Sequence, residues 1–302
     1  MRHDEGSSFL ARRRDAHYLR GMHRLLRHIE ACNNACLPGR RLPFRIGEAQ
    51  VGWVRPEFAD LLAGFAGISR DEAGVTLDPG RAADLPGISR NLAERGLLGW
   101  RGELFDVRAE PGGKVLAEID RAALPAFGIL AEGVHVNGLV AREHGLFLWV
   151  GRRASNRQLD PGKLDHLVAG GVPAGLSPWE TLVKEAAEEA AIPRSLAAQA
   201  VPVAHIRYTA DRPEGLRRDL LHCYDLMLPA DFTPHPADGE ATGFELWPVA
   251  EALRVVAETD AFKFNVNLVL IDLFLRHGVI DPAGAEGRLL RERLDAPLAA
   301  GA

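Results

Sequence analysis

The pattern of apolar and polar positions changes near residue 128, and the two halves of the chain predict different folds. In the first half, the pattern predicts helices at residues 15–31, 57–65 and 88–97, a hairpin-like segment at 44–54 around Gly47, and strands at 104–107 and 115–119. The last two strands flank Pro111-Gly112-Gly113, a sequence typical of a turn. This mixture of short elements indicates a small α+β domain.

The second half has longer and more regular apolar runs. They predict strands at residues 134–141, 146–152, 164–169, 201–208, 220–228 and 244–249, and helices at 177–192, 249–258 and 264–277. A turn at residues 142–145 joins the first two strands into a hairpin. We therefore expect an N-terminal α+β domain at 1–127, an α/β domain at 128–285 and a C-terminal tail at 286–302. No low-complexity linker separates the halves, so the domains are expected to pack together.

The helix expected at residues 177–192 presents three acids on one face. Ser177, Pro178 and Glu180 are typical of an N-cap, a first helical residue and a capping-box acid, and Pro193 ends the helix. At about 100° per residue, one third of the circumference carries Glu185, Glu188 and Glu189. The opposite side carries the residues expected to pack, which are Trp179, Val183, Ala186, Ala187 and Ala190.

These acids lie in the C-terminal half of the helix, where they carry an electrostatic cost. They repel one another and oppose the helix dipole, each effect costing roughly a few tenths of a kcal/mol. Lys184 is the only basic residue inside the helix. A solvated acidic face is one interpretation. A bound Mg²⁺ or Mn²⁺, which prefers oxygen ligands, is the other, and the glycine pair at 170 and 171 would let a diphosphate approach it closely.

From Gly170 to Ile192 the sequence resembles the Nudix hydrolase signature. That signature is a glycine, five residues, a glutamate, seven residues, and then Arg-Glu-hydrophobic-x-Glu-Glu-x-Gly-hydrophobic. Gly170 aligns with the first glycine of the signature. The second half of the signature aligns with Lys184, Glu185, Ala186, Glu188, Glu189 and Ile192. Three positions depart from it: Leu176 replaces the first glutamate, Lys184 the arginine and Ala191 the late glycine. The missing glutamate and arginine usually help to position the helix, and a Glu180–Lys184 pair is a possible substitute that competes with the cap.

The resemblance implies an α/β/α sandwich with a mixed sheet for the second domain, and a metal-dependent mechanism. Glu185, Glu188, Glu189 and the backbone carbonyl of Ala169 are the implied ligands of Mg²⁺ or Mn²⁺. The ion would neutralise the diphosphate oxygens and lower the pKa of a bound water that attacks phosphorus. Glu240, in an Asp-Gly-Glu turn, stands where related enzymes often supply another metal-binding acid or a base. The alternative for Glu240 is an acid that only caps a turn.

Basic and polar residues upstream of the glycines are the expected substrate ligands. Arg152 and Arg153 end a strand, so alternation sends only one of them towards the substrate, where a guanidinium suits a terminal phosphate. Lys163 lies in the loop that leads to the glycines, and His135 and Asn137 share one face of a strand. The alternative for each is a solvated or structural role.

Four longer segments extend the resemblance from the family signature to one subfamily. They are residues 133–140, 148–171, 224–244 and 262–278. All four are similar to the Nudix region that precedes thiamine pyrophosphokinase in some fungal proteins, a region that also occurs alone behind an N-terminal domain of unknown function. Some members of that subfamily act on oxidised or otherwise damaged thiamine diphosphates and leave the monophosphate. The resemblance covers roughly residues 15–280 and implies a diphosphatase with a small-molecule substrate.

Two other functions stay open. One is another Nudix activity: hydrolysis of ADP-ribose or related nucleotides, or isoprenyl diphosphate isomerisation, which needs a catalytic cysteine that only Cys223 could supply in the second half. The other is a non-catalytic ligand-binding module, which the retention of three costly acids disfavours. The N-terminal domain has three roles open to it: completing the pocket, forming a homodimer interface, or both.

Composition excludes several other classes of protein. The chain has 302 residues, 47% hydrophobic and 25% charged, which is ordinary for a globular protein of two modest domains. Its net charge of -5 argues against nucleic acid as the main partner. No run of about 18 apolar residues predicts a membrane helix, and the N-terminus lacks the apolar core of a signal peptide. Cys32, Cys36 and Cys223 lack metal-site spacing, so we expect a reducing cytoplasm.

Overall fold

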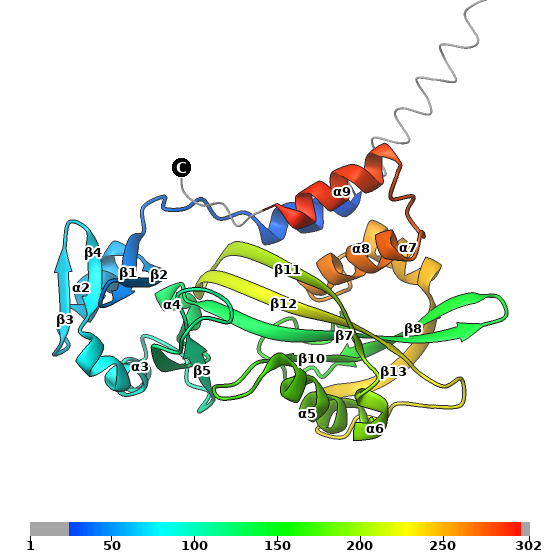
Figure 1. Ribbon diagram of the computed structural model, residues 1–302, viewed down its shortest axis with the longest axis horizontal. Coiled ribbons are helices and arrows are strands. Elements are labelled where there is room, and N and C mark those ends of the chain that lie inside the picture. Colours follow the sequence, from blue (N-terminus) through cyan, green and yellow to red (C-terminus); the bar gives the residue numbers. More distant parts are fainter. Residues whose placement is uncertain (1–23, 297–302) are drawn as a thin grey trace, which may run out of the picture.

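In the computed structural model, which describes residues 24–296, residues 42–129 form a domain with its own core (Figure 1). Its sheet has the order β2-β1-β4-β3, built from β1 (Leu42–Ile46), β2 (Ala49–Val54), β3 (Ile68–Asp71) and β4 (Gly74–Leu77). The other elements are α2 (Pro56–Leu62), a 3₁₀ turn (Pro79–Asp84), α3 (Leu85–Glu94), α4 (Leu124–Phe127) and a hairpin of β5 (Leu104–Val107) and β6 (Ala117–Asp120). The predicted α+β class is confirmed. The sequence did not predict β3, β4 and α4, although it predicted the equally short β5 and β6, which flank a recognisable Pro-Gly-Gly turn.

The second domain is built on a seven-stranded mixed sheet. Its main order is β11-β12-β7-β8-β13, with β10 paired to β7 and β9 to β8. The strands are β7 (Leu130–Arg142), β8 (Gly145–Arg153), β9 (Leu164–Asp165), β10 (Val168–Gly171), β11 (Val201–Arg212), β12 (Gly215–Met227) and β13 (Ala241–Pro248). β7 pairs with β12 in parallel and with β8 through the predicted hairpin turn.

Helices cover both faces of this sheet (Figure 1). One face carries α5 (Pro178–Ala190) and α6 (Arg194–Ala197), and the other carries α7 (Val249–Glu258), α8 (Val266–Arg276) and α9 (Ala285–Asp295). The expected α/β/α sandwich is therefore confirmed. Side chains of β7 alternate between the two layers: Val134 and Val136 belong to the core under α5, whereas His135 and Asn137 point to the α8 layer. This alternation decides which predicted residues can meet the acids of α5.

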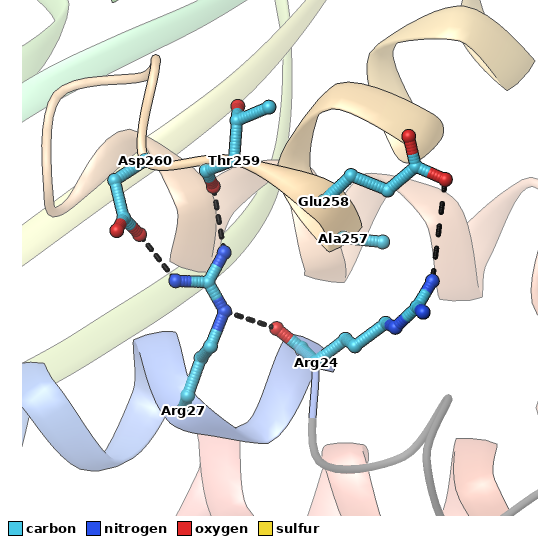
Figure 2. A pocket seen from close by; sticks show the side chains of 6 residues that line it. All are labelled: Arg24, Arg27, Ala257, Glu258, Thr259 and Asp260. Carbon is cyan, nitrogen blue, oxygen red and sulfur yellow. Dashed lines mark hydrogen bonds and ion pairs between the residues drawn. The ribbon is translucent and has the colours of Figure 1, made fainter.

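The helix at residues 24–32 packs on the second domain, although it precedes the first domain in the chain. Its buried Leu25, Leu26 and Ile29 share a core with α7, α8 and α9. Figure 2 shows how its polar side is fixed: the Arg27 guanidinium donates to the Thr259 carbonyl at 2.6 Å and pairs with Asp260. Of the helix predicted at residues 15–31, the part before residue 24 lies outside the described residues.

The segment predicted as a C-terminal tail instead contains α9. Leu290 and Leu294, four residues apart, are 0% and 4% exposed and belong to the core above α8. An apolar pair at this spacing is the mark of a short amphipathic helix, and it is too brief to stand out among the charged residues around it. Among residues 24–296, no helix is long and apolar enough to cross a membrane.

Candidate acidic metal site

Helix α5 begins where the capping residues predict. The Ser177 hydroxyl accepts the Glu180 backbone N–H at 3.2 Å, and the Glu180 carboxylate accepts the Ser177 backbone N–H at 2.9 Å. This reciprocal capping box satisfies two N–H groups that the helix itself leaves free. The start of the helix therefore fixes the register that places the three acids.

The packed side of α5 agrees in part with the predicted one, since Ala186 and Ala190 are buried and Val183 packs against the same core. The buried stripe consists of Leu182, Ala186 and Ala190, each four residues from the next, while Trp179 and Ala187 are exposed. A stripe at i, i+4 and i+8 follows one ridge of the helix surface, and this ridge faces the sheet. The whole helix is turned slightly relative to the prediction, which brings the acids to the edge of the contact with β10.

Glu189 is the most enclosed of the three acids. Its carboxylate accepts the backbone N–H of Ala169 at 2.8 Å, so the acid is bound to the strand that carries the glycine pair. Burial raises the pKa of Glu189 well above its ordinary value, and the nearby Glu185 adds to the effect. The ionised form of a buried carboxylate that has only one neutral hydrogen-bond donor would be stabilised by a bound cation.

Glu185 and Glu188 share the one lysine of the helix. Lys184 Nζ lies 3.0 Å from Glu185 Oε1 and 2.7 Å from Glu188 Oε2. The expected Glu180–Lys184 pair does not form, because Glu180 is held in the capping box. Burial raises the pKa of Glu185, and the Lys184 hydrogen bond opposes that rise. The Glu185 side chain, 16% exposed, fills the space beside Gly170, where a Cβ would lie 2.6 Å from its carboxyl carbon.

A second acidic group approaches from the loop before β13. Single carboxylate oxygens of Glu189, Asp238 and Glu240 lie within 4.8 Å of one another. The Glu240 side chain, 40% exposed, also pairs with Arg157. The structure thus brings Glu240 to the acids, as predicted, and adds Asp238, which the sequence reasoning missed. Asp238 also caps the turn by accepting the Glu240 backbone N–H, so its position in the Asp-Gly-Glu turn was the available signal.

Arg153 is committed to a buried ion-pair network, although it also lines the hollow that contains Glu189 and Glu240. Its guanidinium bonds to Asp165 at 2.5 Å and to the Leu159 carbonyl at 2.9 Å, and Lys263 lies 3.6 Å from the same carboxylate. Burial opposes the ionisation of Asp165, but these two cations outweigh it and hold its pKa at about 2. Arg152, by contrast, is exposed and lines the same hollow as Glu189 and Glu240. Arg153 is less exposed than Arg152, yet both arginines line this hollow, so it stays a prediction that only one of them reaches the substrate.

His135 and Asn137 do not meet the acids. The Nδ1 atom of His135 lies 2.9 Å from Nδ1 of His166, and the Asn137 amide donates to Asp225 at 2.9 Å. Burial lowers the pKa of His135 well below its usual value. Odd-numbered positions of β7 face the α8 layer, so a strand-face pattern could group the two residues but could not place them on the side of α5.

Of the two remaining predicted residues, one lies at the site and one does not. The strand residue Ala169 lines the hollow between Glu189 and Glu240, as a residue whose carbonyl is to bind metal should. Lys163 lies outside that hollow and pairs with Asp160 at 3.5 Å. The site that the structure assembles therefore consists of the three α5 acids, Ala169, the Asp238–Glu240 turn and Arg152.

Known proteins match both domains. A NUDIX domain model matches residues 131–267, and a model described as a domain of unknown function, DUF4743, matches residues 24–131. Nudix hydrolase 20, chloroplastic, from Arabidopsis thaliana is 38% identical over 284 residues, which cover 88% of this chain and 76% of that protein. Nudix hydrolase 24, chloroplastic, of the same plant is 40% identical over 268 residues, covering 85% and 73%. This chain belongs to the Nudix hydrolase family.

Two solved structures are similar to part of this chain. DR0079 from Deinococcus radiodurans is 23% identical with a TM-score of 0.44, and the match covers 56% of this chain and 97% of that one. The NUDIX domain of Shewanella oneidensis NrtR, solved with ADP ribose, is 16% identical with a TM-score of 0.40, covering 50% and 90%. Both matches span about half of this Nudix hydrolase.

The departures of this Nudix hydrolase from the family signature have visible consequences. Ala191 adopts a left-handed conformation with φ 54° directly after α5, which is where a glycine usually ends a helix. Lys184 binds Glu185 and Glu188 instead of supporting the helix from outside. Leu176, half-buried, offers no carboxylate to the loop before the helix. The loop must therefore be supported by other contacts.

Replacing Ala191 with glycine is expected to stabilise the protein by about 0.5–1 kcal/mol. Glycine removes the steric cost of the left-handed conformation, roughly 1–2 kcal/mol. Part of this stabilisation is lost, because glycine also increases the conformational entropy of the unfolded state. Urea unfolding measures the change. Ala187→Gly is the matched control, because Ala187 is exposed within the same helix, and there glycine should cost about 1 kcal/mol. A loss of stability in Ala191→Gly would contradict the expectation.

Proposed function

We propose that this Nudix hydrolase is a Mg²⁺- or Mn²⁺-dependent diphosphatase that converts thiamine diphosphate, or an oxidised or damaged analogue, to the monophosphate and phosphate. The observation that carries the reaction class is the meeting of Glu189 from α5 with Asp238 and Glu240 from a distant loop, within 4.8 Å. Acids from two separate elements converge only at a cost, which a bound cation offsets.

The residues of the site fit a hard divalent cation. Their donors are carboxylate oxygens and the Ala169 carbonyl, the ligand type that Mg²⁺ and Mn²⁺ prefer. Glu189 and Glu185 have raised pKa values because they are buried, and a divalent charge would favour their ionised forms. When bound, such an ion supplies neutralisation of the diphosphate oxygens and a water of lowered pKa.

The protein's own residues supply orientation and charge balance. The Ala169 N–H holds one carboxylate oxygen of Glu189 and leaves the other free. Arg157 pairs with Glu240, and Lys184 pairs with Glu185 and Glu188, so each of these acids has a cation beside it. Arg152, exposed at the rim of the hollow and bonded to the Gly162 carbonyl at 3.3 Å, is the cation placed to bind the terminal phosphate. Glu240 is the group placed to accept a proton from the attacking water.

Support for the thiamine-type substrate comes from the four long segments that resemble the fungal thiamine pyrophosphokinase-linked subfamily. The isomerase alternative loses ground, because Cys223 is 1% exposed in the core on the α8 face and burial raises its pKa. A cysteine in that state is a poor reactive group. A Cys223→Ala variant that keeps the full activity of the protein would remove this alternative.

A substrate panel tests the proposal. Purified protein with Mg²⁺ or Mn²⁺ is incubated with thiamine diphosphate, its oxidised analogues, ADP-ribose, dinucleotides and isoprenyl diphosphates. The products are separated and quantified by chromatography, because cleavage of ADP-ribose or a dinucleotide gives two phosphate monoesters and no free phosphate. We expect the highest kcat/KM for a thiamine-type diphosphate, loss of at least about 99% of the activity on chelation, and recovery when Mg²⁺ is returned. A higher kcat/KM for ADP-ribose would overturn the substrate assignment, and full activity in chelator would overturn the metal-dependent mechanism.

A further inference from the structure

The hairpin of β5 and β6 in the N-terminal domain touches the glycine pair of the second domain. Gly171 has no room for a side chain: an added Cβ would lie 2.5 Å from the ring tip of Phe105 and 3.4 Å from the guanidinium carbon of Arg121. Both residues belong to the first domain, in β5 and directly after β6. The glycine at this position therefore reflects contact between domains as well as approach of a substrate.

Backbone hydrogen bonds fix the loop that follows. The Ala174 N–H donates to the Leu104 carbonyl of β5 at 2.7 Å, and the Val172 N–H donates to the Glu132 carbonyl of β7 at 2.9 Å. The loop from residue 171 to α5 is thus held between the N-terminal hairpin and the central strand. In Figure 1 the chain leaving β10 passes beside β5 before it enters α5.

The hairpin is itself firmly held. Phe105 is 3% exposed and belongs to the core of the N-terminal domain. Arg121 lies over its ring at 5.6 Å and pairs with Glu103 at 2.9 Å. A buried ring under a paired guanidinium is a rigid surface, so its contact with Gly171 restricts the loop.

The clamped residues are directly connected to the acids. Gly170, next to Gly171, packs against the Glu185 carboxyl, and Ala169 donates its N–H to Glu189. In the family signature, a glutamate at the position of Leu176 helps to position the catalytic helix, and here that acid is missing.

We propose that the β5–β6 hairpin positions the metal-binding acids by clamping residues 171–174, and so replaces the support lost at Leu176. Phe105 is the main positioning residue, and Arg121 assists it. The N-terminal domain thus acts on the Nudix site by supporting the loop that precedes α5. The expected effect on kcat rests on the proposed metal-dependent hydrolysis. The expected restriction of the loop at residues 171–174 does not.

The first test replaces Phe105 with alanine in the full chain. Hydrogen exchange is expected to speed up at least about tenfold in residues 171–176 and to stay unchanged in α8. Mg²⁺ affinity, measured by calorimetry, and kcat should each fall about tenfold, the usual range for the loss of a contact that supports a metal ligand. Phe58→Ala is the matched control, because Phe58 packs in the same core, on Phe127, away from the loop. It should lose stability without these changes.

The second test is a double-mutant cycle with Gly171→Ala. Alone, the added methyl collides with the Phe105 ring and should lower Mg²⁺ affinity and kcat. In the Phe105→Ala background the same methyl has room, so its additional effect should fall below about twofold. If Phe105→Ala does not fold, Arg121→Ala, whose side chain is 44% exposed, takes its place in the first test, with the same changes expected in loop exchange and Mg²⁺ affinity.

Different results separate the two proposals. Unchanged loop exchange and unchanged Mg²⁺ affinity in Phe105→Ala, or additive effects in the cycle, would overturn the positioning role. Faster loop exchange and weaker Mg²⁺ binding in a protein that hydrolyses none of the panel substrates would uphold it and count against the proposed diphosphatase instead.

Discussion

Replacing Glu189 with glutamine is expected to lower phosphate release by at least about a hundredfold, as removal of one metal-bound charge from a hydrolytic site does. The glutamine oxygen can still accept the Ala169 N–H, so the link between α5 and β10 remains. The substitution also replaces a carboxyl group whose pKa is raised by burial with a neutral amide. The metal-free variant should therefore be at least as stable as the parent protein. High stability with lost activity distinguishes a metal ligand from a structural acid.

Steady-state phosphate release and thermal unfolding, each with and without Mg²⁺, provide the measurement. Glu188→Gln should behave similarly in activity, although its side chain is 52% exposed and it gains less in stability. Glu143→Gln, in the exposed turn between β7 and β8, is the control and should change neither quantity. If Glu189→Gln releases phosphate at the parental rate, the acids of α5 are not the metal site.

The parts of the fold that the sequence predicted depend on local chemistry. Ser177, Pro178 and Glu180 fixed the start of α5, because capping is decided within four residues. The hairpin of β7 and β8 followed from its turn and two apolar runs. The packed side of α5 was misjudged at Trp179 and Ala187, because apolar character alone does not say which ridge of a helix meets the sheet.

The parts of the site that the sequence could not predict depend on distant contacts. Glu189 and Asp238 are separated by almost fifty positions, and only the path of β13 beside β8 brings them together. The commitment of Arg153 to Asp165 and of Asn137 to Asp225 is likewise set by neighbouring strands and loops. A residue's type indicates what it can bind, but its partner in the folded chain decides whether it is free to do so.

The C-terminal helix offers the second large effect, through a buried aspartate. Asp272 on α8 has a side chain 1% exposed, paired with Arg276 at 2.6 Å and with Arg291 of α9 at 2.8 Å. Asp272→Ala would remove the carboxylate that joins Arg276 to Arg291, while Arg276 keeps Asp225 and Arg291 keeps Asp295. Losing two hydrogen bonds between charged groups costs about 3–5 kcal/mol. We expect this loss in urea unfolding, followed by tryptophan fluorescence.

Arg291→Ala separates the contribution of α9 from that of α8. The Arg291 side chain is 36% exposed, and without it Asp272 keeps its bond to Arg276, so the loss should be only about 1–2 kcal/mol. Asp231→Ala, at an exposed position after β12, should cost less than about 0.5 kcal/mol. If Asp272→Ala costs no more than Asp231→Ala, the pairing with Arg291 does not hold α9 on the domain. If the loss of stability instead decreases from Asp272→Ala to Arg291→Ala to Asp231→Ala, residues 285–295 are part of the folded core. If these residues were only loosely attached, Asp272 would be reached by water and its replacement would cost little.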